Sequence, residues 1–282
     1  MRISFITLIF LSFSVGTFAQ QTSPDSGFTN KAEAKNKMVN GLKEGKWMEY
    51  LDANGDSTQD ATLATYCCLT YYKDGEPDGT KKDYRNGKLE YETPYTNGKI
   101  NGIKKVYYKS GNIQSETPYI NDEKNGTKKE YYDDGTMQVV TPFINDTING
   151  VKKQYYENGK LEEEDPYING VLNGVKKEYY INGTIQTETP YSNDKVNGVK
   201  KEYYENGKLE SEDPYTNDVE NGLKKEYYES GIIQAETPFT GGQLNGVFKE
   251  YYENGIVKTE IIYTNGVSVT TKKYNVNGNE VK

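Results

Sequence analysis

The chain has 282 residues and a formal net charge of −8, and it contains no histidine. An acidic chain lacks the Lys and Arg excess that nucleic-acid binding needs, and the missing histidine removes the commonest general base and metal ligand. Hydrophobic residues are only 34% of the chain, which argues against a thick core, whereas 27 tyrosines argue against simple disorder.

The first residues are typical of a secretory signal peptide. Arg2 provides a small positive charge, an apolar stretch runs from Ile3 to Phe18, and Ala19 precedes Gln20. The stretch is shorter than the ~20 residues of a membrane-spanning helix, and no charged stop follows it. We therefore predict a signal peptide at 1–19 that is cleaved, in preference to an uncleaved anchor, and a secreted or periplasmic protein of the bacterial cell envelope that does not span the membrane.

The next two segments differ from the rest of the chain. Residues 20–38 are polar, with Pro and Gly but no apolar period, and predict a flexible leader. Residues 39–79 predict degenerate N-terminal repeats that form a cap. They include Cys67 and Cys68, which as strand neighbours would point to opposite faces and are interpreted as two small apolar residues.

A unit of 24 residues then repeats through 80–265, and 266–282 predicts a C-terminal cap. Three series of positions, two of glycine and one of proline, keep this period. Their positions are Gly102, Gly126, Gly150, Gly174, Gly198, Gly222 and Gly246; Gly87, Gly111, Gly135, Gly159, Gly183, Gly207, Gly231 and Gly255; and Pro94, Pro118, Pro142, Pro166, Pro190, Pro214 and Pro238.

Each unit predicts a β-hairpin. Two extended, Tyr-rich runs at 151–157 and 160–167 flank Asn158-Gly159, and Asn-Gly favours a two-residue type I′ turn. Such a turn would place Glu157 opposite Lys160, Tyr156 opposite Leu161, and Lys153 opposite Glu164. A longer link, 168–174, would connect one hairpin to the next.

The predicted register can be tested on the other units. Lys faces Glu at the equivalent position in most of them, and such a pair contributes only about 0.2–1 kcal/mol, so it sets register more than stability. The pairs are Lys81–Glu92, Lys105–Glu116, Lys177–Glu188, Lys201–Glu212, Lys225–Glu236 and Lys249–Glu260, with one failure at Lys129–Val140.

The register also predicts the shape. The second Tyr of each pair would lie beside an aliphatic residue, and the first would share the opposite face with Val and Pro. Both faces would then carry a thin apolar stripe, which favours one layer over a sandwich. We predict an all-β fold, an elongated single-layer antiparallel meander of tandem 24-residue β-hairpin repeats.

The recurring Lys-Glu-Tyr-Tyr-Glu-Asn-Gly-Lys-Leu, followed by Tyr-x-Asn-x-x-x-Asn-Gly, resembles the MORN-repeat variant family over roughly residues 38–265. Such bacterial proteins are often described as antitoxin-like repeat proteins. The resemblance implies an elongated meander of hairpins that contacts proteins or lipids. A cytoplasmic antitoxin role would contradict the predicted export.

Two kinds of functional site, a glycosidase and a calcium site, can be compared with the residues that recur in the repeat. The acids at 162–165 could suggest a paired-carboxylate glycosidase, but acids recur in unit after unit opposite Lys, as on solvated strand faces. Asn-Asp pairs such as Asn121-Asp122 could suggest Ca²⁺ loops, yet Asn, Asp and Gly are also what turns require. The sequence predicts no enzyme, catalytic residue, metal site or cofactor.

The doubled tyrosines remain the candidate binding residues. They never become Phe, which indicates either a hydroxyl that serves a ligand or aromatics half exposed on a two-faced sheet. Our leading hypothesis is an exported non-enzymatic scaffold that binds an envelope or extracellular protein. The alternative is a cell-envelope glycan-binding module that uses the second tyrosines, Tyr108, Tyr132, Tyr156, Tyr180, Tyr204, Tyr228 and Tyr252.

Overall fold

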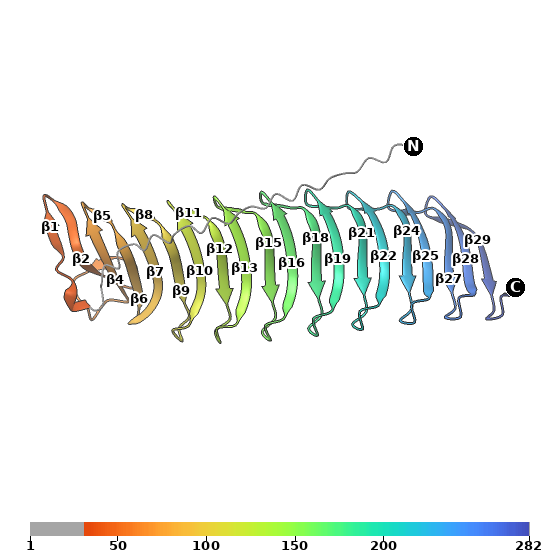
Figure 1. Cartoon of the computed structure of the whole chain (residues 1–282), viewed down its shortest axis with the longest axis horizontal. Coiled ribbons are helices and arrows are strands. Elements are labelled where there is room, and N and C mark those ends of the chain that lie inside the picture. Colours follow the sequence, from red (N-terminus) through yellow and green to blue (C-terminus); the bar gives the residue numbers. More distant parts are fainter. Residues whose placement is uncertain (1–30, 282) are drawn as a thin grey trace, which may run out of the picture.

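The computed structural model describes residues 31–281, so the predicted signal peptide at 1–19 and the first part of the predicted leader lie outside the described residues. The described chain forms one antiparallel sheet of 30 strands, and its only helical element is the short 3-10 helix η1 (Lys31–Glu33). Successive hairpins follow one another along a long ribbon (Figure 1). The elongated all-β meander is therefore confirmed.

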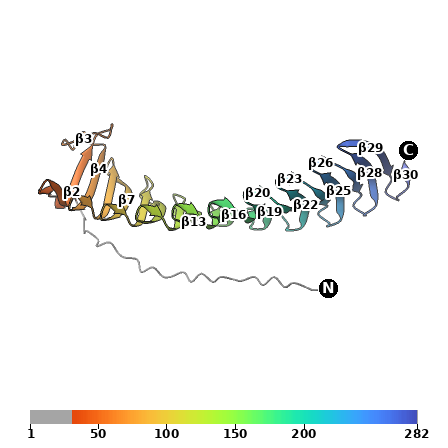
Figure 2. The same cartoon turned by 90° about the horizontal axis from the view of Figure 1, so that it is seen from above.

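The ribbon is not flat. Seen from above, it is bowed, and its two ends curve toward the same side (Figure 2). Strands twist relative to their neighbours, so a long open sheet accumulates curvature of this kind.

The regular units each contain two long strands and one short strand. The first strands are β9 (Gly102–Tyr107), β12 (Gly126–Tyr131), β15 (Gly150–Tyr155), β18 (Gly174–Tyr179), β21 (Gly198–Tyr203), β24 (Gly222–Tyr227) and β27 (Gly246–Tyr251). The second strands are β10 (Ile113–Ile120), β13 (Met137–Ile144), β16 (Leu161–Ile168), β19 (Ile185–Ser192), β22 (Leu209–Thr216), β25 (Ile233–Thr240) and β28 (Val257–Thr264). The short strands are β8 (Lys99–Ile100), β11 (Glu123–Lys124), β14 (Thr147–Ile148), β17 (Val171–Leu172), β20 (Lys195–Val196), β23 (Val219–Glu220) and β26 (Gln243–Leu244).

The Asn-Gly hairpin turn differs from the prediction. The Gly159 N–H donates to the Tyr156 carbonyl (2.8 Å) and the Tyr156 N–H donates to the Lys160 carbonyl (2.9 Å), so the loop has three residues. Only Gly159 takes a positive φ (80°); Asn158 does not. This is a type I turn closed by a left-handed glycine, which needs one positive φ where type I′ needs two. The predicted oppositions Glu157–Lys160 and Tyr156–Leu161 are wrong.

A β-bulge then restores the predicted register. Tyr155 pairs with Leu161 but Gln154 pairs with Glu163, so Glu162 is the extra residue. The bulge offsets the one-residue shift that the longer loop introduced, and Lys153 lies opposite Glu164 as predicted. The equivalent predictions are confirmed at Lys105–Glu116, Lys177–Glu188, Lys201–Glu212, Lys225–Glu236 and Lys249–Glu260, and Lys129 does face Val140.

Type I′ turns occur instead in the links between hairpins. Asn169 (φ 51°) and Gly170 (φ 81°) connect β16 to β17, and Asn121 (φ 51°) and Asp122 (φ 74°) do the same between β10 and β11. The Asp122 carboxylate also accepts the Ile100 N–H of the preceding link (2.6 Å). The Asn-Asp pairs thus serve the turns and fasten one link to the next.

Each unit is also joined to the next through a glycine and a proline. Gly222 begins β24 with φ 132°, and a β-carbon placed on it would lie 2.8 Å from Cγ of Pro214. The Pro214 carbonyl accepts the Asn221 N–H (2.8 Å), and β22 continues two residues past the proline. Glycine is required here both by the backbone angle and by the close proline ring.

The N-terminal end carries the largest buried cluster. It is built from β1 (Lys37–Val39), β2 (Leu42–Leu51), β3 (Ser57–Thr58), β4 (Tyr66–Lys73) and β5 (Glu76–Pro77). Free Cys67 and Leu69 pack with Met48, Tyr50 and Tyr84. Cys68 is free and buried as well, and burial raises the pKa of its thiol to about 12. Helix η1 and the first two residues of β1 lie within the described part of the predicted leader, and both elements cover the outer edge of β2.

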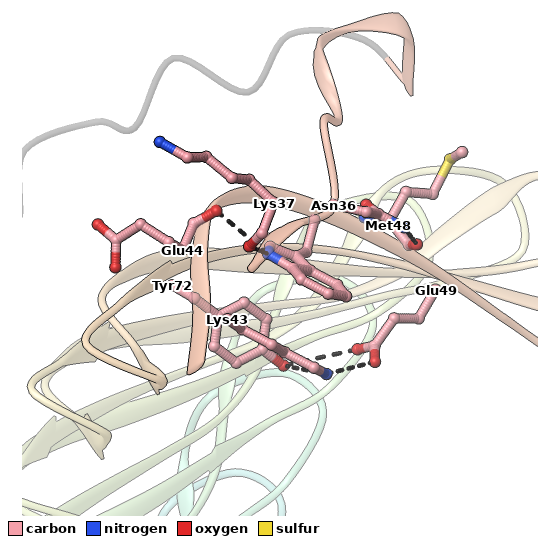
Figure 3. A network of polar contacts seen from close by, with 8 residues as sticks. Asn36, Lys37, Lys43, Glu44, Met48, Glu49 and Tyr72 are labelled. Atoms are coloured by element: carbon pink, nitrogen blue, oxygen red, sulfur yellow. Dashed lines mark hydrogen bonds and ion pairs between the residues drawn. The ribbon is translucent and has the colours of Figure 1, made fainter. Parts of the chain in front are cut away.

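Polar contacts brace this end (Figure 3). Lys43 lies between the rings of Trp47 (5.0 Å) and Tyr72 (4.7 Å), and its ammonium donates to Glu49 (2.5 Å). The Asn36 side chain donates to the Met48 carbonyl and accepts the Met48 N–H. It thus gives these two backbone groups on the outer edge of β2 the hydrogen bonds that a neighbouring strand would otherwise make.

One hairpin precedes the regular units, and it is shorter by one residue. Strands β6 (Gly79–Arg85) and β7 (Lys88–Thr96) are joined by a true type I′ turn at Asn86 (φ 48°) and Gly87 (φ 77°). The missing residue shifts the 24-residue period by one in β6, so Lys82 is the equivalent of Lys153 and faces Glu92, and the predicted Lys81–Glu92 pair is wrong.

The C-terminal end is formed by β29 (Val267–Tyr274) and β30 (Glu280–Val281), which lie within the predicted C-terminal cap. Nothing helical within residues 31–281 has the length and hydrophobicity needed to cross a bilayer.

Candidate interaction surface

The two faces of the sheet follow from strand alternation. We call face A the face that carries Val151, Lys153 and Tyr155, and face B the face that carries Lys152, Gln154 and Tyr156. The strand pairing extends each row of side chains across all units, so every position of the repeat becomes a line along the ribbon.

The charged pairs form a ladder along face A that is interrupted once, at Val140. Glu164 lies opposite Lys153 in its own unit and opposite Lys177 in the next. The Lys153 ammonium lies 2.9 Å from the Glu164 carboxylate. Burial alone would raise the pKa of Glu164, but hydrogen bonds from Lys153 and Tyr179 outweigh it and hold that pKa below its ordinary value. Each glutamate of the ladder thus lies between lysines of two neighbouring strands.

The first tyrosine of each pair bonds to this ladder. The Tyr179 hydroxyl donates to Glu164 of the preceding unit (2.9 Å), and burial together with that carboxylate raises the pKa of Tyr179 to about 12. The same bond joins Tyr107 to Glu92, Tyr131 to Glu116, Tyr203 to Glu188, Tyr227 to Glu212 and Tyr251 to Glu236. Tyr155 is the exception, because the row holds Val140 where Glu stands in its neighbours.

The second tyrosines, which were the predicted binding residues, link unit to unit on face B. Each hydroxyl donates to the main-chain carbonyl of the first tyrosine in the following unit, or of Tyr274 at the end. The contacts are Tyr108–Tyr131 (2.7 Å), Tyr132–Tyr155 (2.8 Å), Tyr156–Tyr179 (2.6 Å), Tyr180–Tyr203 (2.8 Å), Tyr204–Tyr227 (2.5 Å), Tyr228–Tyr251 (2.7 Å) and Tyr252–Tyr274 (3.0 Å).

These bonds give both tyrosines a structural reason to keep the hydroxyl. The rings are half-buried, and each hydroxyl of these pairs except that of Tyr155 has an acceptor within the chain. A ligand role for the second tyrosines stays a prediction. The bonds between units were not foreseen, because a pattern within one unit does not show that Tyr156 reaches a carbonyl 23 residues later.

Face B is polar and internally paired. Thr117, Thr141 and Thr189 are buried in one row, in which Asp165 (5% exposed) takes the same place in its unit. The Lys176 ammonium lies 3.0 Å from Glu163 and 3.7 Å from Asp165. Burial and the neighbouring Asp165 raise the pKa of Glu163, against the effect of Lys176. The acids weighed as a glycosidase pair are thus held among lysines.

An exposed apolar row remains on face A. Five of its six members pair with prolines across the strands, as Val151 does with Pro166, and Val247 pairs with Ile262. Their side chains are 38–46% exposed. We call this row the apolar stripe, and it consists of Ile103, Val151, Val175, Val199, Leu223 and Val247.

The stripe repeats in each regular unit except one, in which Thr127 lies opposite Pro142, and the charge ladder lies beside it. A contiguous exposed apolar surface rimmed by polar side chains is typical of an interaction site. From Val151 to Val247 the arrangement offers a partner an apolar contact in each successive unit.

Comparison with known families matches more than half of the chain. The family model described as MORN repeat variant matches residues 84–97, 100–121, 124–145, 148–169, 172–193, 196–217, 220–240 and 244–265. No curated protein matches the chain.

Proposed function

The chain belongs to the MORN repeat variant family, and from that premise we propose that it is an exported, non-enzymatic scaffold that binds another protein along the apolar stripe of face A. MORN repeats generally act as scaffolds for contacts with proteins or membranes. The proposed partner is an envelope or extracellular protein, in keeping with the signal peptide that the sequence predicts.

The apolar stripe is the observation that carries the proposal. Its members lie two strands apart, so the spacing is about 10 Å from unit to unit, given ~4.8 Å between strands. An extended partner that contacts several units gains from multivalency, since the second and later contacts form at high effective concentration. The neighbouring Lys–Glu ladder would fix the register of such a partner.

The glycan-binding alternative depends on tyrosine hydroxyls, and these already donate within the chain. Charged headgroups of anionic lipids are disfavoured by the net charge of −8. A protein partner fits the exposed surface best.

The proposal is tested by crosslinked capture from cell-envelope extracts. We expect the triple variant Val151→Lys, Val175→Lys and Val199→Lys to lose the captured protein. The matched control is Leu63→Lys, Ile181→Lys and Val276→Lys, which alters three exposed apolar residues outside the stripe and adds the same charge. Equal capture by both variants, or capture of a polysaccharide alone, contradicts the proposal.

A further inference from the structure

The short β6–β7 hairpin breaks the line of second tyrosines. Tyr84 pairs with Leu89 as Tyr155 pairs with Leu161, so the next residue, Arg85, stands where every regular unit has its second tyrosine. In the regular units that tyrosine bonds forward to the next unit. At the start of the array the forward bond would have to reach the carbonyl of Tyr107.

Arg85 turns in the opposite direction. Its guanidinium lies 4.8 Å from the ring centroid of Tyr66 and donates to the Tyr66 hydroxyl, and it pairs with Glu90 at 3.6 Å. The interval between the β6–β7 hairpin and the end of β9, which a tyrosine ring bridges in later units, is therefore open.

A hollow of about 270 Å³ occupies this interval. It is lined by Arg85, Lys88, Leu89, Tyr107, Tyr108 and Lys109. Small-molecule pockets span about 300–1,000 Å³, so this hollow is on the scale of one amino acid side chain. Leu89 and the two tyrosines supply apolar walls.

The rim of the hollow is basic in an acidic chain. Lys109 stands at a loop position that carries Asp133, Glu157, Glu205, Glu229 and Glu253 in other units. Lys88 donates to the Lys109 carbonyl (2.6 Å), which holds its ammonium at the rim. Together with Arg85 these lysines give three cations against one carboxylate, Glu90.

We propose that this hollow binds a tyrosine side chain presented by an acidic segment of a partner protein. The phenol hydroxyl donates to the Tyr107 carbonyl, as Tyr108 does to Tyr131, and the ring packs between Leu89 and Tyr108. Carboxylates that flank the tyrosine pair with Lys88 and Lys109. The choice of a protein as occupant rests on the proposed function, and the hollow would fix one end of the partner while the stripe binds the rest.

A second, more open hollow of about 440 Å³ lies between the next two hairpin loops. Its lining is Gly111, Asn112, Ile113, Tyr131, Asp134 and Gly135, with no basic residue. It therefore offers an acidic segment no charge partner, which sets the first hollow apart.

The test is calorimetric titration of the full chain with the peptide acetyl-Asp-Glu-Tyr-Glu-Asp-amide. We expect saturable binding. A peptide with Phe in place of Tyr should bind about fivefold more weakly, because one hydrogen bond is lost, and a peptide with Ala should bind at least tenfold more weakly. Arg85→Tyr supplies the missing ring and should abolish binding. Lys109→Glu should weaken it severalfold, and Lys208→Glu, with the same charge change on the same loop edge, should leave it unchanged.

Thermal unfolding checks that each variant is folded. Equal losses in Lys109→Glu and Lys208→Glu would mean that the peptide binds by overall charge and would overturn the proposal. Absence of saturable peptide binding, or binding of phosphatidylglycerol vesicles alone, would also overturn it. Because the peptide never reaches the stripe, failure here leaves partner capture by the wild-type chain intact and so is distinguishable from failure of the proposed function.

Discussion

The β6–β7 hairpin and the regular hairpins differ by one residue in the loop. The turn between β15 and β16 has a loop of three residues, Glu157, Asn158 and Gly159, whereas the turn between β6 and β7 has only Asn86 and Gly87. Both keep the bulge that follows, and both place a lysine opposite the ladder glutamate. Strand register thus survives a change of turn type.

What changes is the contact between units. The regular loop is preceded by a tyrosine whose hydroxyl reaches the next unit, whereas the short loop is preceded by Arg85, which turns back to Tyr66. The residues that set the strand register therefore build each hairpin, and the residue before the loop, a second tyrosine or Arg85, determines how that hairpin contacts its neighbour.

The largest effect is expected where both regions use the same contact between units. Gly102 faces Pro94 and Gly222 faces Pro214, at 3.1 and 2.8 Å from an added β-carbon to Cγ. Gly102→Ala and Gly222→Ala should each destabilise by about 3 kcal/mol, because a strained φ and a clash add together. Urea unfolding followed by circular dichroism measures this.

The control for that pair is Gly207→Ala. Gly207 also has a positive φ (83°), but an added β-carbon would have nothing within 4 Å. Only the strain of a non-glycine residue at positive φ then destabilises the Gly207→Ala variant, by about 1 kcal/mol. Equal effects at Gly207 and Gly222 would show that the proline contact contributes nothing.

Converting the short hairpin into a regular one should stabilise the chain. The change is Arg85→Tyr with one glutamate inserted before Asn86, which restores the three-residue loop and the forward hydroxyl. We expect a gain of about 1–1.5 kcal/mol from one net hydrogen bond and a filled hollow. Hydrogen exchange of the Tyr107 and Tyr108 amides should slow, and unchanged exchange would contradict the role assigned to the tyrosine.

Removing one bond between regular units should cost less. Tyr180→Phe loses the hydroxyl that donates to the Tyr203 carbonyl (2.8 Å) and should destabilise by about 1 kcal/mol, the net value of one hydrogen bond. Tyr191→Phe is the matched control, since other units already carry Phe143 and Phe239 at that position. A larger loss at Tyr191 than at Tyr180 would refute the assignment.

The sequence was sufficient for the hairpins and not for the contacts between them. The period of 24 and the Lys–Glu oppositions predicted the sheet and its register, because strand pairing acts between residues that are close in the repeat. The turn type was missed since Asn-Gly serves both a type I′ turn and a type I turn closed by glycine, and a compensating bulge leaves no mark on the period.

The candidate surface was only partly foreseen. The stripe of Val and Pro follows from alternation, as the predicted placement of Val and Pro on one face indicated. The forward bond of Tyr156 and the hollow beside Arg85 depend on which neighbour a long side chain reaches, and no pattern within one unit determines that direction.

The smallest expected effect concerns the single gap in the charge ladder. Val140 lies between Lys129 and Lys153 and leaves the Tyr155 hydroxyl without the glutamate that its equivalents have. Val140→Glu should therefore stabilise the chain by about 0.5 kcal/mol, because the new carboxylate would form an exposed ion pair with lysine and accept a hydrogen bond from Tyr155.

The pH dependence of this gain follows from the equivalent Glu164, which has a lowered pKa in the folded chain, held there by Lys153 and Tyr179 against the effect of burial. A carboxyl with a lowered folded pKa stabilises above its ordinary value of about 4.3, and the gain is lost as the pH falls through the lowered value. Urea midpoints of wild type and variant should thus differ at pH 7 and converge near pH 3; a gain that persists in acid would mean that packing, not charge, produces it.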